Sequence, residues 1–192
     1  SIIFQGIFST DAMRHVWSDE NRNAKYIEIE RALAIVQARL GLIPQAAADE
    51  IVSHCKLEKI DMARLRQQTE RIGYPILGVV TQINQLCRDK LGEFVHWGAT
   101  TQDITDTATV LQIREALKFV DDELAAIATA MARLAKEHRL TPVIGRSNLQ
   151  QAIPVTFGYK MAGLLSAIER HRERLAQLKE RVAVLVERRT QL

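Results

Sequence analysis

An unbroken series of apolar residues, separated by alternating steps of three and four, is the feature that most constrains the fold of this chain. From Val110 it continues through Ile113, Leu117, Val120, Leu124, Ile127, Met131 and Leu134. Such spacing places the side chains on one stripe of a single helix and is typical of coiled coils and helical bundles. A helix from about Asp103 to His138 would be ~50 Å long at about 1.5 Å per residue.

The last segment of the chain repeats this pattern after a break at Thr141-Pro142. Its apolar stripe consists of Ile168, Leu175, Leu178, Val182 and Leu185, with His171 expected as a buried polar residue at one position of the stripe. Two helices of this length cannot bury their apolar stripes within a chain of 192 residues. We therefore expect an oligomeric helical bundle in which further helices cover both stripes.

The remaining sequence predicts helices and no period-2 strand, so the expected fold class is all-α. Capping residues, glycines and prolines place the helices at Ser18–Leu40, Pro44–His54, Asp61–Gly73 and Pro75–Leu91, with Pro154 as the first residue of the last helix. The expected domains are an N-terminal helical region, residues 1–99, and the first long helices of the central bundle, residues 100–192.

The composition excludes several classes of protein. A hydrophobic content of 47% with 26% charged residues is that of a globular protein. The net charge of +3 and the 5% of aromatic residues, which do not alternate with basic ones, argue against nucleic-acid binding. No apolar run reaches the ~20 residues of a membrane span. The only cysteines, Cys55 and Cys87, form no Cys-x-x-Cys pair, so we expect no metal site and a cytoplasmic location.

Two short polar segments stand near the predicted starts of the long helices. The first is His96-Trp-Gly-Ala-Thr-Thr-Gln-Asp103. The hydroxyls of Thr100 and Thr101, together with free N–H groups of a first helical turn, can bind a carboxylate. Alternatively, the same residues form a helix cap and nothing more. The spacing alone favours this second interpretation.

The second segment is Gly145-Arg-Ser-Asn-Leu-Gln-Gln-Ala-Ile-Pro154. Its three amides, at Asn148, Gln150 and Gln151, and the hydroxyl of Ser147 exceed what a connecting loop requires. Arg146 is expected to form a structural ion pair rather than to hold a substrate.

Together, the two segments resemble signature regions of the fumarase/aspartase superfamily, whose members cleave C–N or C–O bonds and often release fumarate. The opening Phe8-Ser-Thr-Asp-Ala-Met13 and Trp17-Ser-Asp-Glu-Asn-Arg22 is similar to the first helices of the branch that contains 3-carboxy-cis,cis-muconate cycloisomerase and adenylosuccinate lyase. Residues 96–107 and the Leu-Gln-Gln-Ala stretch are most similar to the cycloisomerases. The likeness covers nearly the whole chain.

This resemblance implies a β-elimination, or the reverse addition, on a small polycarboxylate, without a cofactor or a metal. It also implies a homotetramer in which three subunits build each site. The residues expected to bind substrate are His96, Thr100, Thr101, Gln102 and Asp103 on one wall, and Ser147, Asn148 and Gln150 on the opposing wall.

The chain departs from the family pattern in three ways, and no catalytic residue is assigned. Asn148 stands where the superfamily usually has a histidine, and an amide cannot exchange a proton near neutral pH. Gly73-Tyr74-Pro75 replaces the Arg-His-Asp usual in adenylosuccinate lyases, which leaves that activity as the alternative. The family's Gly/Ser-rich loop with its catalytic serine is absent.

We therefore expect these 192 residues to be the N-terminal portion of a lyase and to be inactive alone. A non-catalytic helical assembly module is the alternative of another class, since such a module needs only the apolar stripes.

Overall fold

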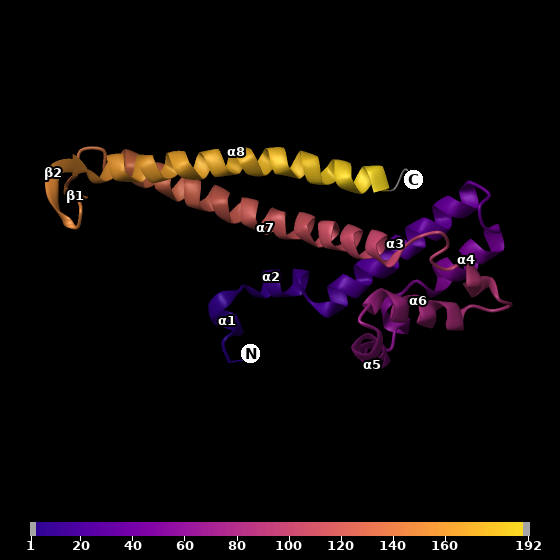
Figure 1. Ribbon diagram of the computed structural model, residues 1–192. Helices are drawn as coiled ribbons and strands as arrows, with labels where there is room; N and C mark the ends of the chain where they lie inside the picture. Colours follow the sequence, from indigo (N-terminus) through magenta and orange to yellow (C-terminus); the bar gives the residue numbers. More distant parts are fainter. Residues whose placement is uncertain (1–2, 190–192) are drawn as a thin grey trace. The chain divides into compact units, whose positions relative to one another are not determined.

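The computed structural model describes residues 3–189, and the expected all-α class is confirmed apart from one two-stranded sheet (Figure 1). The elements are α1 (Gln5–Phe8), α2 (Asp11–Val16), α3 (Asp19–Arg39), α4 (Gln45–His54), η1 (Leu57–Lys59), α5 (Met62–Ile72), α6 (Pro75–Leu86), η2 (Leu91–Phe94), α7 (Thr101–Glu137), β1 (Pro142–Ser147), β2 (Gln150–Thr156) and α8 (Phe157–Arg189). They form two compact units, one reaching Glu115 and one comprising Ala116–Ala183. The expected domain boundary between residues 99 and 100 stays a prediction.

The predicted capping residues begin and end the helices of the first unit. Ser18 Oγ accepts a hydrogen bond from the N–H of Asn21 at the start of α3. Asp61 does the same for α5, which ends at Gly73 in the left-handed region, with φ of 87°. A residue without a Cβ adopts this conformation without the steric cost that others pay.

Helix α6 starts at Pro75 as predicted but ends at Leu86, five residues before the expected Leu91. The chain turns away because the backbone N–H of Arg88 donates to Glu50 Oε1 over 3.1 Å, a bond to another helix that a continuing α6 would not allow.

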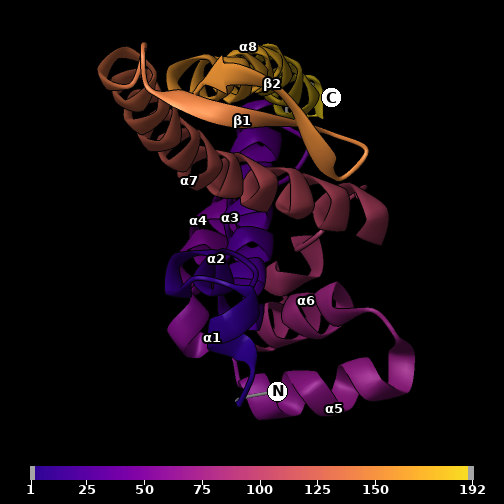
Figure 2. The ribbon, with the colours of Figure 1, turned by 90° about the vertical axis from the view of Figure 1, so that its left-hand side faces the viewer.

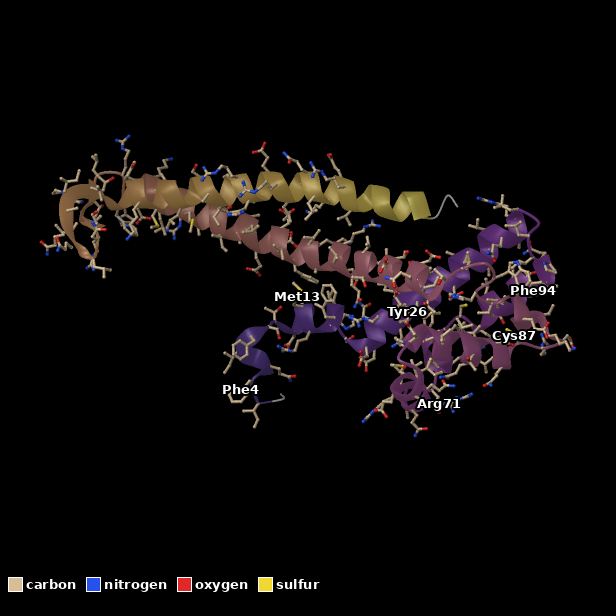
Figure 3. The ribbon with its side chains drawn as sticks, in the orientation of Figure 1. Phe4, Met13, Tyr26, Arg71, Cys87 and Phe94 are labelled. Carbon is tan, nitrogen blue, oxygen red and sulfur yellow. The ribbon has the colours of Figure 1, made fainter. Side chains whose placement is uncertain are left out.

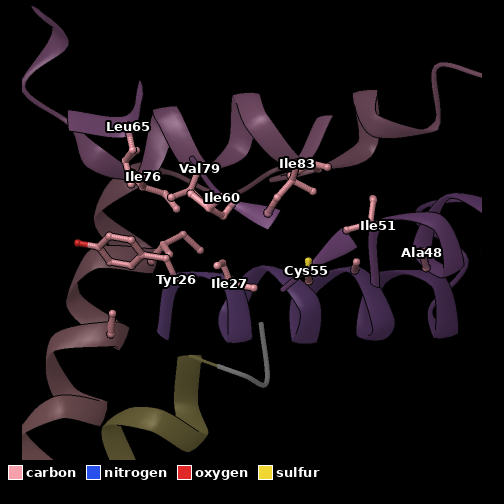
Figure 4. Close-up of a cluster of buried hydrophobic side chains, with 14 of the residues drawn as sticks. Tyr26, Ile27, Ala48, Ile51, Cys55, Ile60, Leu65, Ile76, Val79 and Ile83 are labelled. Carbon is pink, nitrogen blue, oxygen red and sulfur yellow. The ribbon is translucent and has the colours of Figure 1, made fainter. Parts of the chain in front are cut away.

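The hydrophobic core of the first unit lies between α3, α4, α5 and α6 and reaches the start of α7 (Figure 4). Ile51, Ile76, Val79 and Ile83 are fully buried there. Removing one such aliphatic side chain from water contributes roughly 1.5–3 kcal/mol. This core holds α3 in a fixed position, and α3 in turn carries the residues that fix the segment before α7.

The second unit contains the rest of α7, the hairpin and most of α8. Helix α7 confirms the predicted long helix to within two residues at its start and one at its end. Gly158 allows α8 to begin close to the end of α7, because a Cβ there would lie 2.5 Å from the carbonyl oxygen of Ala135. Lys179 on α8 is paired with Asp121 on α7 over 2.5 Å, so the two helices run side by side (Figure 1).

The apolar stripes of these helices are only partly covered. On α7, Leu117, Leu124, Met131 and Leu134 are half-buried, whereas Val120 and Ile127 are exposed. On α8, Leu178 is exposed. His171 is exposed in this chain, its ring 2.9 Å from the guanidinium of Arg174, so its expected burial within a bundle of several chains stays a prediction. The side chain of Leu185 lies outside the described residues.

A β-hairpin replaces the predicted loop and helix start between α7 and α8 (Figure 2). Strands β1 and β2 pair antiparallel, with Ser147 opposite Gln150 and a register shift between Ile144 and Arg146. Pro154 therefore lies in β2, opposite Ile144, and does not open a helix. Helix α8 begins only at Phe157, where Thr156 Oγ1 accepts from the N–H of Tyr159.

Candidate active site

The start of α7 is capped by the side chain of Asp103, at the end of the first polar segment. The N–H of Thr100 donates to Asp103 Oδ2 over 3.0 Å, and the N–H of Asp103 donates to the Thr100 carbonyl over 3.1 Å. The Asp103 carboxylate therefore caps the helix itself; this is the carboxylate half of a capping box, without the bond from the Asp103 N–H to the Thr100 hydroxyl. The amide of Gln102 bonds Asp106 one turn later.

Two hydroxyls at this helix start stay unused by the cap. Those of Thr100 and Thr101 make no hydrogen bond within residues 3–189; Thr100 is exposed and Thr101 half-buried. The first N–H groups of a helix lack intrahelical acceptors, and the helix dipole adds positive potential. Free hydroxyls and N–H groups at a positive helix end are suited to binding an anion such as a carboxylate.

The turn that leads into α7 is fixed by contacts with α3 and η2. Gln37 Nε2 donates to the Trp97 carbonyl over 2.6 Å. The rings of Phe94, labelled in Figure 3, and Trp97 lie 5.5 Å apart at their centroids. Gly98, with φ of 68°, supplies the left-handed residue that the turn needs. The helix start is therefore a rigid element rather than a loose loop.

His96 contacts an acidic residue that sequence reasoning missed. Its Nδ1 lies 2.6 Å from Oε1 of Glu30, a residue of α3 that is 66 positions away and 1% exposed. This hydrogen bond raises the pKa of His96 above its usual 6.5, against the opposing effect of burial. Glu30 could have been found from its place on the buried stripe of α3, between Ile27 and Ala34, where a carboxylate is out of place.

The second polar segment lies at the tip of the hairpin. Asn148 and Leu149, with φ of 49° and 64°, form the two-residue turn, and Ser147 and Gln150 are the paired residues beside it. All of these side chains are exposed. Arg146 forms no ion pair within the described part of this chain, so its expected structural ion pair stays a prediction.

The structure thus brings the predicted residues together in two groups. His96, Thr100, Thr101, Gln102 and Asp103 gather in the first unit, and Ser147, Asn148 and Gln150 in the second. Their roles toward a substrate stay predictions. Within residues 3–189, no cluster of three or more possible metal ligands occurs, and no helix is long and apolar enough to cross a membrane.

Comparison with known proteins places this arrangement in a family. Residues 6–188 match the family described as Lyase. Trans-aconitate decarboxylase 1 of Mycosarcoma maydis is 56% identical over 93% of this chain and 36% of that protein. The 3-carboxy-cis,cis-muconate cycloisomerase of Pseudomonas putida is 37% identical over 92% of this chain and 42% of that protein.

The fold is shared with solved structures as well. The crystal structure of a fumarate lyase from Mesorhizobium sp. BNC1 superimposes with a TM-score of 0.86 at 47% identity, over 91% of this chain and 41% of that one. This chain spans about two fifths of the length of the relatives it matches. By the family match and by its similarity to these proteins, the chain is a member of the lyase family, within the fumarase/aspartase superfamily.

Proposed function

We propose that the native protein is a lyase or cycloisomerase that acts on a small polycarboxylate, with an unsaturated tricarboxylate as the first choice. The observation that carries this proposal is the rigid start of α7, where the unused hydroxyls of Thr100 and Thr101 stand at a positive helix end in a member of the lyase family. Two similar proteins are named for trans-aconitate and 3-carboxy-cis,cis-muconate, which are both unsaturated acids with three carboxylates; the first has one carbon–carbon double bond and the second has two.

The chemistry of such acids explains why fixed donors are needed. Removing a proton from the carbon beside a carboxylate places a second negative charge on that group, as an aci-carboxylate. Donors already aimed at its oxygens stabilise this charge without reorganising during the reaction. A hydrogen bond to a charged group contributes about 1.5–3 kcal/mol, so the two threonine hydroxyls together supply a useful part of the stabilisation. The base that takes the proton is not among the residues we assign.

The cycloisomerase reaction is our finer proposal, and adenylosuccinate lyase is the alternative. The residues that stand in place of Arg-His-Asp have local roles here. Gly73 ends α5, Tyr74 is exposed, and Pro75 is the first residue of α6. None of them offers a charged group for a phosphate, which supports a substrate without one.

We further propose that the site is assembled between chains of a homotetramer in the cytoplasm. Helix α7 has 37 residues and, as a continuous helix, is about 55 Å long. The resemblance to the fumarase/aspartase superfamily implies that three subunits build each site. The exposed apolar Val120 and Ile127 on α7 support contacts with other chains, and the free thiols of Cys55 and Cys87 support a reducing compartment.

The substitution Thr101→Val tests this proposal. It removes a hydroxyl without a partner and keeps the size of a half-buried side chain, so the native protein should fold normally and lose most of its turnover of trans-aconitate or 3-carboxy-cis,cis-muconate. Thr109→Val is the matched control on the same helix, because that hydroxyl is exposed and only bonds the Thr105 carbonyl. Equal turnover in both variants would contradict the site, and a wild-type protein inactive on both acids and on adenylosuccinate would contradict the proposed class of reaction.

A further inference from the structure

Glu30 is a buried carboxylate with incomplete hydrogen bonding. It is 1% exposed on α3; Oε1 bonds His96, and Oε2 has no hydrogen-bond partner in the described part of the chain. Burying an acid in an apolar core costs stability, and an aliphatic residue of the same size would pack there at lower cost. The fold alone therefore gives no reason for a carboxylate at this position.

His96 is held in an unusual conformation at the other end of this contact. Its φ of 61° lies in the left-handed region, which costs steric energy for a residue with a Cβ. An ionised carboxylate can only accept, so Nδ1 carries the proton in the 2.6 Å bond to Glu30. The second ring nitrogen, Nε2, has no partner among residues 3–189 and is left for another group.

The charged groups around His96 come from two elements. Glu30 on α3 and Asp103 at the start of α7 are both acidic, and both raise the pKa of the imidazole. A cationic imidazole donates hydrogen bonds from both nitrogens, whereas a neutral one with its proton on Nδ1 would present a lone pair at Nε2. The Nε2–H of His96 is therefore present below the raised pKa and is lost as the pH rises through it.

We propose that Glu30 is a positioning residue whose buried carboxylate accepts from Nδ1 and orients His96, so that Nε2–H binds a carboxylate of the substrate beside Thr100 and Thr101. This inference rests on the proposed function and adds to it a residue on α3, outside both polar segments. Glu30 itself touches no substrate and acts only through the imidazole.

A purely structural role makes a different prediction. If Glu30 only held the turn before α7 against α3, any side chain that accepts a hydrogen bond from Nδ1–H of His96 would suffice. The hydrogen bond from Gln37 to the Trp97 carbonyl already holds this turn against α3. Glu30→Gln keeps an acceptor for Nδ1–H and removes the charge, so it separates the two roles. Glu30→Asp keeps the charge on a side chain one methylene shorter.

The experiment measures kcat and KM against pH with trans-aconitate in the native protein, and the His96 titration by NMR of labelled histidine. In Glu30→Gln we expect KM to rise roughly 10- to 100-fold, the effect of losing a charged hydrogen bond, with kcat little changed. The NMR pKa of His96 and the alkaline limb of kcat/KM should move to lower pH together, and Glu30→Asp should restore both in part. His96→Gln assigns the NMR signal.

Glu50→Gln is the matched control, since Glu50 is also a buried acid that faces a histidine, His54, at 3.2 Å. It should lower stability and leave KM and the His96 titration unchanged. If the wild-type protein is active, an unchanged KM and an unchanged His96 pKa in Glu30→Gln would overturn the inference. If the wild type turns over none of the acids, the proposed function fails, and the NMR titration, with trans-aconitate added as a probe of Nε2, still decides whether Glu30 controls the charge of His96.

Discussion

Two glutamate–histidine contacts in the first unit show how the surroundings of a residue decide its role. Glu50 is fully paired: Arg88 donates to both of its oxygens, His54 contacts it, and these bonds lower its pKa to about 2. Glu30 has one partner and one unpaired oxygen. A carboxylate whose hydrogen-bonding capacity is satisfied by the protein stabilises a fold, whereas the unpaired oxygen of Glu30 is the observation behind the positioning role that we propose for it.

At the same scale, Cys55 should be inert until the first unit unfolds. It is 8% exposed, and burial raises the pKa of its thiol to about 12, so the nucleophilic thiolate is almost absent at neutral pH. Labelling with a thiol reagent in a Cys87→Ser variant should therefore follow the unfolding curve in urea. Rapid labelling at zero denaturant, at the rate seen in urea, would mean that the core around α3 and α4 opens locally.

At the scale of elements, helix boundaries could be predicted from sequence where a capping side chain or a glycine specifies them. Ser18, Asp61, Gly73 and Pro75 each have a local effect on the backbone, and each lies where expected. The hairpin could not be predicted in this way. Its turn uses Asn148 and Leu149 instead of an Asn-Gly pair, and the shift near Gly145 interrupts the alternation of β1.

Gly145 is the residue on which the hairpin depends. A Cβ there would lie 2.6 Å from the backbone carbonyl oxygen of Ile153 on the facing strand, a distance that side chains do not tolerate. Gly145→Ala should therefore open the irregular pair and increase amide exchange along β1 and β2. Gly163→Ala is the control in α8, where a Cβ meets nothing within 4 Å and where alanine should stabilise the helix by roughly 0.5–1 kcal/mol. Equal protection of the strands in both variants would contradict the close contact.

At the scale of the whole molecule, the apolar stripes could be predicted from sequence, but the contacts that complete the site could not. The stripe on α7 follows from spacing alone. The contact of Glu30 with His96 joins residues 66 positions apart, and no local pattern pairs them. The polar side chains at the hairpin tip likewise have no hydrogen-bond partner within the described residues, and their role stays a prediction.

The exposed part of the α7 stripe should control assembly of the native protein. Ile127 is 40% exposed, and a lysine there would place a charge in any apolar contact between chains without disturbing the first unit. We expect Ile127→Lys to shift the mass in solution from the proposed tetramer to smaller species in sedimentation experiments, and to reduce turnover in parallel, because the proposed site between chains cannot form in a monomer. Thr129→Lys is the control, since two residues along a helix turn the side chain by about 200°, to the far side of α7. If Ile127→Lys has the same mass in solution and the same turnover as Thr129→Lys, the exposed part of the α7 stripe is not an interface. The proposed contacts between chains at the two polar segments would then have to form through other surfaces.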